Sequence, residues 1–200
     1  RGEETKMKLS VAVFLIVIVG ALAKKPQVIT SVADNKGCRE LTLCRFTAKM
    51  HMGDRLLAVT SDLKSTHPLY QDSMGTSTSP DPRLIQLDHA PKLHCDSYVS
   101  MGSPADHHAS DCVRTTPDFK WGADGKSVKG DWFCMNPHSE QTAKSELMIG
   151  QFAIPKHATL EGTLTLHVNN KGVPGRGLRN EKIKVSCGKN TKSNKPNKKN

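Results

Sequence analysis

The six cysteines of this 200-residue chain follow an N-terminal apolar run, and this combination limits the fold more than any other feature. The run, Val11–Val19, comes after Lys6 and Lys8 and is followed by the small-residue sequence Ala21–Ala23. A basic start, a short apolar run and such a cleavage site are typical of a secretory signal peptide. The run is also shorter than the roughly 20 residues of a membrane-spanning helix. Residues 1–23 are therefore predicted to be upstream residues and a signal peptide, and the even cysteine count predicts three disulfides in a secreted protein.

The rest of the chain is predicted to form one domain, residues 24–188, with a basic tail at residues 189–200. Lysine and arginine number 29 against 19 aspartate and glutamate residues, which gives a net charge of +10. The tail holds five lysines and no acidic residue, so it accounts for half of this excess. Its polar composition cannot bury apolar surface, and we expect it to be disordered. It either binds acidic polymers or membrane surfaces, or it only keeps the protein soluble.

Alternating apolar and polar residues predict β-strands along most of the domain. Within residues 41–52, one strand face would carry Cys44, Phe46, Ala48, Met50 and Met52. Further candidate strands lie at residues 55–60, 84–87, 92–99, 147–154, 160–168 and 183–187. Six to eight short strands separated by turn sequences indicate an all-β fold, a two-sheet immunoglobulin-like sandwich stabilised by disulfides.

Six cysteines can pair in many ways, and their positions along the chain favour one set of pairs. Cys38 precedes the first strand of this pattern and Cys187 lies in the last, so a bridge between them would tie the two ends of the sandwich. On the chain-entropy model, that bridge would contribute about 5 kcal/mol. Cys95 and Cys112 flank a loop rich in glycine, serine and histidine and form the next natural pair, which leaves Cys44 with Cys134.

Motifs for catalysis and metal binding are weak in this sequence. The densest group of potential metal ligands is Asp106, His107 and His108, with Asp111 and Cys112 directly after them. It lacks the spacing of known zinc motifs, so a polar loop beside a disulfide is the simpler interpretation. The sequence also contains no G-x-S-x-G nucleophile motif and no Walker-type phosphate loop. We therefore expect a protein that is not an enzyme and that needs no metal or other cofactor.

Aromatic side chains are concentrated among glycines and lysines in one part of the chain. They are Phe119, Trp121, Trp132 and Phe133, and Met135 follows directly. Aromatic rings beside lysines in loops suit a surface that meets lipid headgroups, or the mouth of an apolar pocket. The alternative is that Trp132 and Phe133 lie in the core beside Cys134.

Four stretches, in order along the domain, resemble the ganglioside activator proteins of the ML lipid-recognition domain family. They are Cys38–Leu43 with Gly53–Val59, Leu93–Val99 with Cys112 and Val113, Phe133–Pro137 with Lys144–Leu147 and Phe152–Pro155, and Leu160–Leu166 with Ile183–Cys187. The resemblance implies a β-cup whose sheets stand apart and enclose an apolar cavity for acyl chains. It also implies a carrier that binds or transfers lipid and that, in some members, presents glycolipids to a hydrolase.

The resemblance further implies which residues of this chain would contact lipid. The cavity mouth would comprise Phe119, Trp121, Trp132, Phe133 and Met135. The cavity wall would comprise Met50, Met52, Phe152 and Leu164, and headgroups would meet Lys120, Lys126 and Lys129. Expected partners are a lipid or glycolipid, a lysosomal or extracellular hydrolase and an anionic membrane or polysaccharide surface, but no nucleic acid. The alternative function is a non-enzymatic extracellular protein that binds acidic polymers or matrix through its basic surface and tail.

Overall fold

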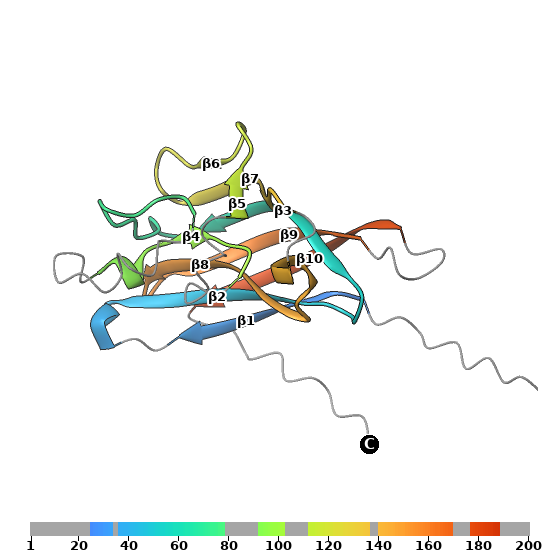
Figure 1. Cartoon of the computed structure of the whole chain (residues 1–200). Helices are drawn as coiled ribbons and strands as arrows, with labels where there is room; N and C mark the ends of the chain where they lie inside the picture. The colour runs from blue at the N-terminus through green and yellow to red at the C-terminus, as the bar shows by residue number, and fades with distance from the viewer. Residues whose placement is uncertain are drawn as a thin grey trace, which may run out of the picture.

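Ten β-strands form two antiparallel sheets in the computed structural model, which describes residues 25–33, 36–78, 92–102, 112–136, 140–169 and 177–188 (Figure 1). Sheet A consists, in order across the sheet, of β1 (Gln27–Ala33), β2 (Leu41–Lys49), β8 (Glu146–Pro155) and β4 (Tyr98–Val99). Sheet B consists of β10 (Leu178–Gly188), β9 (Thr159–Asn169), β3 (Arg55–Ser65), β7 (Ser127–Cys134) and β5 (Val113–Thr115), and β6 (Lys120–Trp121) also pairs with β7. Short 3-10 helices lie between strands at η1 (Lys36–Cys38), η2 (Leu93–Cys95) and η3 (Glu140–Ala143). The predicted disulfide-stabilised β-sandwich is thus confirmed.

The two-residue period of the strands builds a core between the sheets. In β2, Cys44, Phe46 and Ala48 are buried, whereas Arg45 and Thr47 between them remain partly exposed on the other face. The same alternation in β9 buries Leu160, Leu164, Leu166 and Val168. Each fully buried side chain of this size contributes about 2 kcal/mol relative to an exposed one. The apolar face that the sequence predicts for each of these strands is therefore the face that meets the other sheet.

Strand boundaries differ from the prediction where turns and glycines interrupt the pattern. β2 ends at Lys49, and Met52 is 86% exposed in the following turn instead of facing the core. Gly53 has a φ of 85°, and the Asp54 N–H donates to the carbonyl of His51 at 3.0 Å, which closes this turn. The strands β1, β5, β6 and β7 were not indicated by periodicity, so the described residues hold ten strands and not six to eight. The candidate strand at residues 84–87 lies outside the described residues.

The disulfides join Cys38 to Cys95, Cys44 to Cys187 and Cys112 to Cys134, so all three expected pairs are wrong. Cys44 and Cys187 lie on the inward faces of β2 and β10, and their Cα atoms are 6.0 Å apart. Cys38 lies in a separate small cluster with Leu43, Cys95 and Ala153. The Cys44–Cys187 pair follows from two strand faces that meet in the core, whereas Cys38 and Cys95 lie in η1 and η2, and the order of cysteines along the chain shows neither arrangement.

Three disulfides in a small all-β domain fit an extracellular protein. Within the described residues, no helix has the length and apolar character needed to cross a bilayer. The predicted signal peptide and the basic tail lie outside the described residues, so both remain predictions.

Candidate ligand-binding edge of the sandwich

One edge of the sandwich is formed by β4 in sheet A and by the β6–β7 hairpin in sheet B (Figure 1). Residues 69–78, here called the rim, continue sheet A beside β4, since the Val99 N–H donates to the carbonyl of Ser77 at 2.9 Å. At its other end the rim joins the hairpin, because the Leu69 N–H donates to the carbonyl of Gly125 at 2.9 Å. The rim therefore connects the two sheets at this edge, which we call the mouth edge.

A chain of aromatic rings leads from the mouth edge into the core. The ring centroids of Trp121 and Phe152 are 6.2 Å apart, and those of Phe152 and Phe46 are 5.6 Å apart. On the other side, Phe119 lies 5.8 Å from Trp121 and 6.2 Å from Trp132. Trp121 and Phe119 are only partly buried, whereas the other three rings are fully enclosed. Rings from both sheets are thus in contact from the solvent boundary to the interior.

Both tryptophans donate their indole N–H groups across the gap between the sheets. Trp121 Nε1 donates to Ser77 Oγ of the rim at 2.9 Å. Trp132 Nε1 donates to the carbonyl of Ser100, just after β4, at 3.1 Å. A single hydrogen bond of this kind contributes about 1 kcal/mol to stability. The mouth edge is therefore closed by contacts that are individually weak.

Glycine at position 130 allows the aromatic turn to lie against β7. Gly130 has a φ of 110°, and a Cβ there would lie 2.5 Å from the Cα of Phe119. The Phe119 N–H donates to the carbonyl of Thr116 at 3.0 Å and closes the turn. Any larger residue at position 130 would push Phe119 away from the ring of Trp132.

The residues that the resemblance assigns to a lipid site fall into three environments. Phe119 and Trp121 lie at the mouth edge. Buried in the core are Met50, Phe152, Leu164 and Trp132, so Trp132 is a core residue and not a mouth residue. Phe133 lies on the outward face of β7, Met135 is 64% exposed beyond its end, and Met52 is exposed in its turn. Trp132 points inward because it is four residues from buried Val128 on a strand of period two.

The predicted headgroup lysines gather on the β6–β7 hairpin. Lys120 and Lys129 stand directly opposite each other, on the outward face, and Lys129 Nζ lies 3.7 Å from Asp62. Lys126 is partly buried in the hairpin turn. A hollow of about 580 Å³ lies nearby on this outer face, lined by Asp62, Lys64, Glu161, Gly162, Thr163, Lys184, Val185 and Ser186. It is polar and lies outside the sandwich, so it is not the apolar cavity expected between the sheets.

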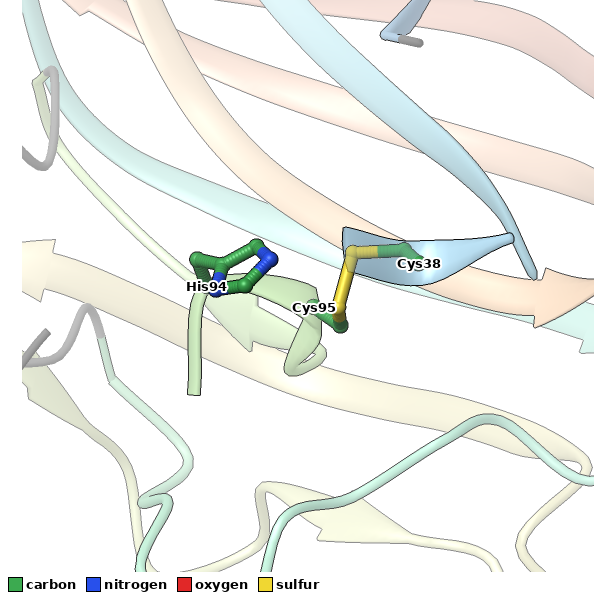
Figure 2. A group of neighbouring side chains, drawn as sticks. All are labelled: Cys38, His94 and Cys95. Atoms are coloured by element: carbon green, nitrogen blue, oxygen red, sulfur yellow. A yellow bond between two sulfur atoms is a disulfide. The ribbon is translucent and has the colours of Figure 1, made fainter. Parts of the chain in front are cut away.

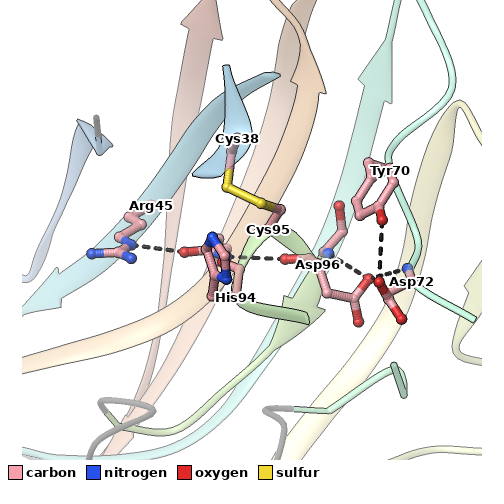
Figure 3. Close-up of a disulfide and its surroundings, with 9 residues drawn as sticks. Cys38, Arg45, Tyr70, Asp72, His94, Cys95 and Asp96 are labelled. Atoms are coloured by element: carbon pink, nitrogen blue, oxygen red, sulfur yellow. Dashed lines mark hydrogen bonds between the residues drawn. A yellow bond between two sulfur atoms is a disulfide. The ribbon is translucent and has the colours of Figure 1, made fainter. Parts of the chain in front are cut away.

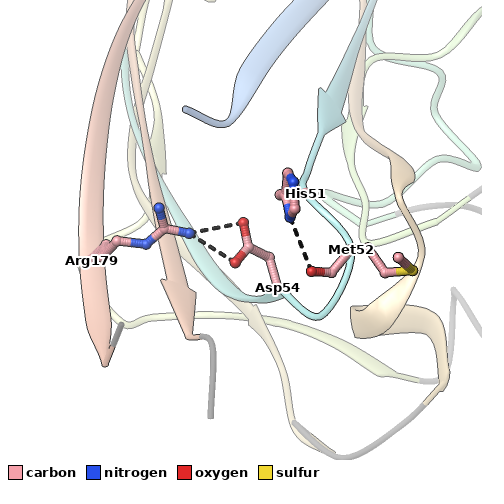
Figure 4. A network of polar contacts seen from close by, with 4 residues as sticks. All are labelled: His51, Met52, Asp54 and Arg179. Atoms are coloured by element: carbon pink, nitrogen blue, oxygen red, sulfur yellow. Dashed lines mark hydrogen bonds and ion pairs between the residues drawn. The ribbon is translucent and has the colours of Figure 1, made fainter. Parts of the chain in front are cut away.

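The opposite edge of the sandwich, here called the stapled edge, is held by stronger links. The Cys44–Cys187 disulfide joins β2 of sheet A to β10 of sheet B. At the other end of β10, both carboxylate oxygens of Asp54, in the turn between β2 and β3, accept hydrogen bonds from Arg179 Nη2 at 2.8 Å (Figure 4). Asp54 is almost fully buried, and the turn that carries it is closed by the His51 backbone.

A buried polar group that sequence reasoning did not indicate lies beside the rim (Figure 3). Gln151 of β8 accepts a hydrogen bond from Arg45 Nε at 2.8 Å through its side-chain oxygen. Its amide nitrogen donates to the carbonyls of His94 and Asp96, both at 3.0 Å. Gln151 therefore fastens the backbone around η2 to the outer side of sheet A.

The Asp96 carboxylate lies at the centre of this group and is fully buried. Its Oδ1 accepts the backbone N–H groups of Asp72 and Ser97 at 2.8 and 2.9 Å. Burial raises the pKa of Asp96 to about 6, although these two hydrogen bonds act in the opposite direction. Burial also raises the pKa of Tyr98, and it raises the pKa of Tyr70, whose hydroxyl donates to Asp72 Oδ2 at 3.1 Å. The one signal in the sequence was an acidic residue inside the otherwise strand-like segment 92–99.

Cys38, His94 and Cys95 bring potential metal-ligating atoms within 4.8 Å of one another (Figure 2). The two sulfurs are bonded to each other in a disulfide. A disulfide sulfur is not a thiolate, and thiolate is the form that binds metal ions. We therefore assign this group to the framework and not to a metal site. The earlier candidate ligands Asp106 to Asp111 lie outside the described residues.

The geometry of the mouth edge is the main guide to function. Comparison of the chain with protein-family models, curated proteins and solved structures finds no match.

Proposed function

We propose that this protein is an extracellular lipid carrier that takes an acyl chain between its sheets at the mouth edge. The observation that carries the proposal is the row of ring contacts from half-buried Trp121 to buried Phe152 and Phe46. Such a row offers an apolar chain a continuous path from solvent into the core. The resemblance to the ML lipid-recognition family supports the same function.

Entry of an acyl chain requires the two sheets to separate at this edge. The hydrogen bonds from Trp121 and Trp132 would break, at a net cost of about 1 kcal/mol each. Burying an apolar chain gains up to about 0.8 kcal/mol for each methylene. A chain of about 16 methylenes gains up to about 13 kcal/mol, which exceeds the loss of the two hydrogen bonds. The energies favour a ligand with a long alkyl chain over a small apolar molecule.

A headgroup of negative charge suits the outer side of the same hairpin. Lys120 and Lys129 stand directly opposite each other, and like charges in this arrangement are unfavourable. Asp62, 3.7 Å from Lys129 Nζ, offsets part of that repulsion, and an anion between the two lysines would relieve the rest. Lys126 lies in the turn of the same hairpin. Because Trp121 follows Lys120 and points to the inner side, a chain that enters past Trp121 would leave its headgroup near these lysines.

A carrier of this kind acts without making or breaking covalent bonds. Its partner would be a membrane, or a hydrolase in the extracellular space or the lysosome that accepts the lipid.

Mass spectrometry of the chain secreted from eukaryotic cells tests the proposal. We expect a native spectrum with about one lipid for each protein, and a bare mass with three disulfides after solvent extraction. The extracted lipid would then be identified directly. A secreted protein that carries no more lipid than an unrelated control, and that takes up none from vesicles, would contradict the proposal.

A pair of matched variants locates the site. Trp121→Ala removes a half-buried ring at the mouth edge, and we expect lipid affinity to fall about tenfold, the effect of losing roughly 1.4 kcal/mol of contact. Val32→Ala removes an apolar side chain that is 59% exposed on β1, and we expect unchanged affinity. Equal effects of the two variants would remove the mouth edge as the site of binding.

The second candidate function, binding of acidic polymers, is favoured by the outer face of sheet B. Strand register places on that face the exposed side chains of Lys64, Lys120, Lys129, Lys182 and Lys184. It predicts retention on heparin that falls with salt. Loss of retention in Lys182→Gln with Lys184→Gln would assign binding to this face, and loss on removal of residues 189–200 would assign it to the tail.

A further inference from the structure

Backbone hydrogen bonds fasten the two ends of the rim to sheet A, through Tyr70 with Ala153 and through Ser77 with Val99, and between them the rim covers one carboxylate, that of Asp96. Asp96 Oδ1 accepts the N–H of Asp72 in the rim and the N–H of Ser97 beside β4. Asp72 in turn holds its neighbours, because its carboxylate accepts the Met74 N–H at 2.9 Å and the Tyr70 hydroxyl. Five residues beyond Asp72, Ser77 accepts the indole N–H of Trp121. Asp96 is therefore the buried titratable group among the contacts that position the middle of the rim over the mouth edge.

The second carboxylate oxygen of Asp96 is buried without a hydrogen-bond partner among the described residues. It lies against the backbone of Gly75 in the rim, where a Cβ would overlap it. Glycine at this position lets the rim backbone cover the carboxylate and keep water away from it. A buried carboxylate with an unpartnered oxygen is unfavourable in its charged form.

The groups that face Asp96 do not neutralise its charge. The nearby Asp72 carboxylate is itself acidic and raises the pKa of Asp96 further. Tyr70 and Tyr98 also lie close, and both are uncharged near neutral pH, because the ordinary pKa of tyrosine is 10.0 and burial raises it further. Arg45 acts through Gln151, whose amide donates to the backbone carbonyls of His94 and Asp96. In the described part of the chain, the carboxylate of Asp96 has no cationic hydrogen-bond partner.

We propose that the rim is a lid over the mouth edge and that Asp96 is its positioning residue, so that acid closes the lid and neutral pH loosens it. The consequence for lipid exchange rests on the proposed function. The lid itself is a property of the protein without ligand, and it can be tested in that state.

The direction follows from proton binding to the closed and open forms. Burial holds the pKa of Asp96 at about 6 when the rim is closed, against an ordinary value of 3.8 when the rim lifts and water reaches the carboxylate. The closed form therefore binds the proton more tightly, and its advantage is lost as pH rises through about 6. Between pH 7.5 and pH 5, opening of the rim should become about tenfold less frequent. Lipid would exchange readily at neutral pH and be retained in an acidic compartment.

Hydrogen–deuterium exchange of the lipid-free protein at pH 7.5 and pH 5 tests the lid. After correction for the intrinsic pH dependence of exchange, we expect protection of residues 69–78 to be about tenfold greater at pH 5. Peptides from β9 and β10 serve as the internal reference and should not show this difference. Equal protection of the rim at both pH values would overturn the proposal.

Two variants separate the charge of Asp96 from other acidic groups. Asp96→Asn is neutral at every pH and similar in shape, so its rim should be protected at pH 7.5 as the wild-type rim is at pH 5. Asp118→Asn changes an exposed carboxyl group in the turn before β6 and should keep the wild-type pH response. If rim protection still depends on pH in Asp96→Asn, another titratable group causes the response. If Asp96→Asn does not fold, the wild-type titration decides, because a midpoint far from pH 6 contradicts the proposal.

Lipid exchange from fluorescent vesicles at the same two pH values separates this proposal from the proposed function. A rim that responds to pH in a protein that binds no lipid would support the lid proposal and contradict the proposed carrier function. Lipid binding with equal exchange rates and equal rim protection at both pH values would support the carrier function and contradict the lid proposal.

Discussion

The two long edges of this sandwich hold the sheets together by different means. At the stapled edge, a disulfide joins β2 to β10, and a buried carboxylate forms two hydrogen bonds with Arg179. At the mouth edge, the described links between the sheets are aromatic contacts, the indole hydrogen bonds of Trp121 and Trp132, and the backbone hydrogen bond from Leu69 of the rim to Gly125 of the hairpin. Local opening begins where individual contacts contribute least. We therefore expect the sheets to part at the mouth edge while the stapled edge acts as the hinge.

The largest effect on stability should come from removing the Cys44–Cys187 disulfide. Cys44→Ser with Cys187→Ser frees a loop of 143 residues. On the chain-entropy model this lowers the free energy of unfolding by about 5 kcal/mol, measured by urea denaturation at pH 7. For a domain of this size, such a loss is enough to leave much of the protein unfolded. A loss below about 2 kcal/mol would mean that the stapled edge is not the stronger of the two.

The second-largest effect should come from breaking the buried ion pair between Asp54 and Arg179, which leaves the disulfide intact. Asp54→Asn leaves the guanidinium of Arg179 facing a neutral group in a mostly buried site, and Arg179 Nε has no hydrogen-bond partner among the described residues. We expect the free energy of unfolding to fall by about 3 kcal/mol in the same assay. Glu146→Gln, which breaks the half-exposed ion pair with Lys49, is the control and should cost at most about 1 kcal/mol. Similar losses in the two variants would contradict a special role for the buried pair.

At the mouth edge, the larger effect should come from Trp132. Trp132→Phe keeps an aromatic ring in the core but removes the N–H that bonds to the buried carbonyl of Ser100. The unsatisfied carbonyl and the smaller ring together should cost about 2 kcal/mol of unfolding free energy. The position of Trp132 in the wild-type core also predicts a tryptophan that acrylamide quenches poorly. Strong quenching of the Trp121→Phe variant, where Trp132 is the remaining tryptophan, would contradict the core placement.

Sequence alone predicted the elements whose apolar face is complete. Leu164, Leu166 and Val168 of β9 alternate without interruption, and that strand forms as expected. In β7, Gly130 replaces one inward residue and Phe133 is an apolar residue on the outward face, so the period of two is hidden and Trp132 was predicted at a mouth. Propensity does not reveal a strand whose position depends on its neighbours β3 and β5.

The disulfides and the Asp96 group required the three-dimensional arrangement. Both Cys44 and Cys187 lie on apolar strand faces, but the prediction followed the order of the cysteines along the chain and paired Cys187 with Cys38 instead. The environment of Asp96 depends on Gln151, 55 residues away, and on a rim whose own sequence has no regular pattern. Local periodicity carries no information about contacts of this range. The mouth edge itself was predicted only in part, through Phe119 and Trp121.

The smallest effect on stability, and the most informative about the comparison of the edges, should come from Trp121→Phe. The indole is half-buried, and after its loss the Ser77 hydroxyl can turn to water, so unfolding free energy should change by less than about 1 kcal/mol. After this loss, the described hydrogen bond that still joins the rim to the hairpin is the one from the Leu69 N–H to the Gly125 carbonyl. Hydrogen exchange of residues 69–78 should therefore accelerate about threefold to fivefold, while exchange of β9 and β10 stays unchanged. A variant that loses as much global stability as Trp132→Phe, with no local change at the rim, would show that the mouth edge unfolds only together with the whole sandwich. Faster exchange at the rim without a loss of unfolding free energy means that the rim opens independently of the rest of the sandwich. A carrier needs this property in order to admit its ligand while the Cys44–Cys187 disulfide keeps the two sheets joined.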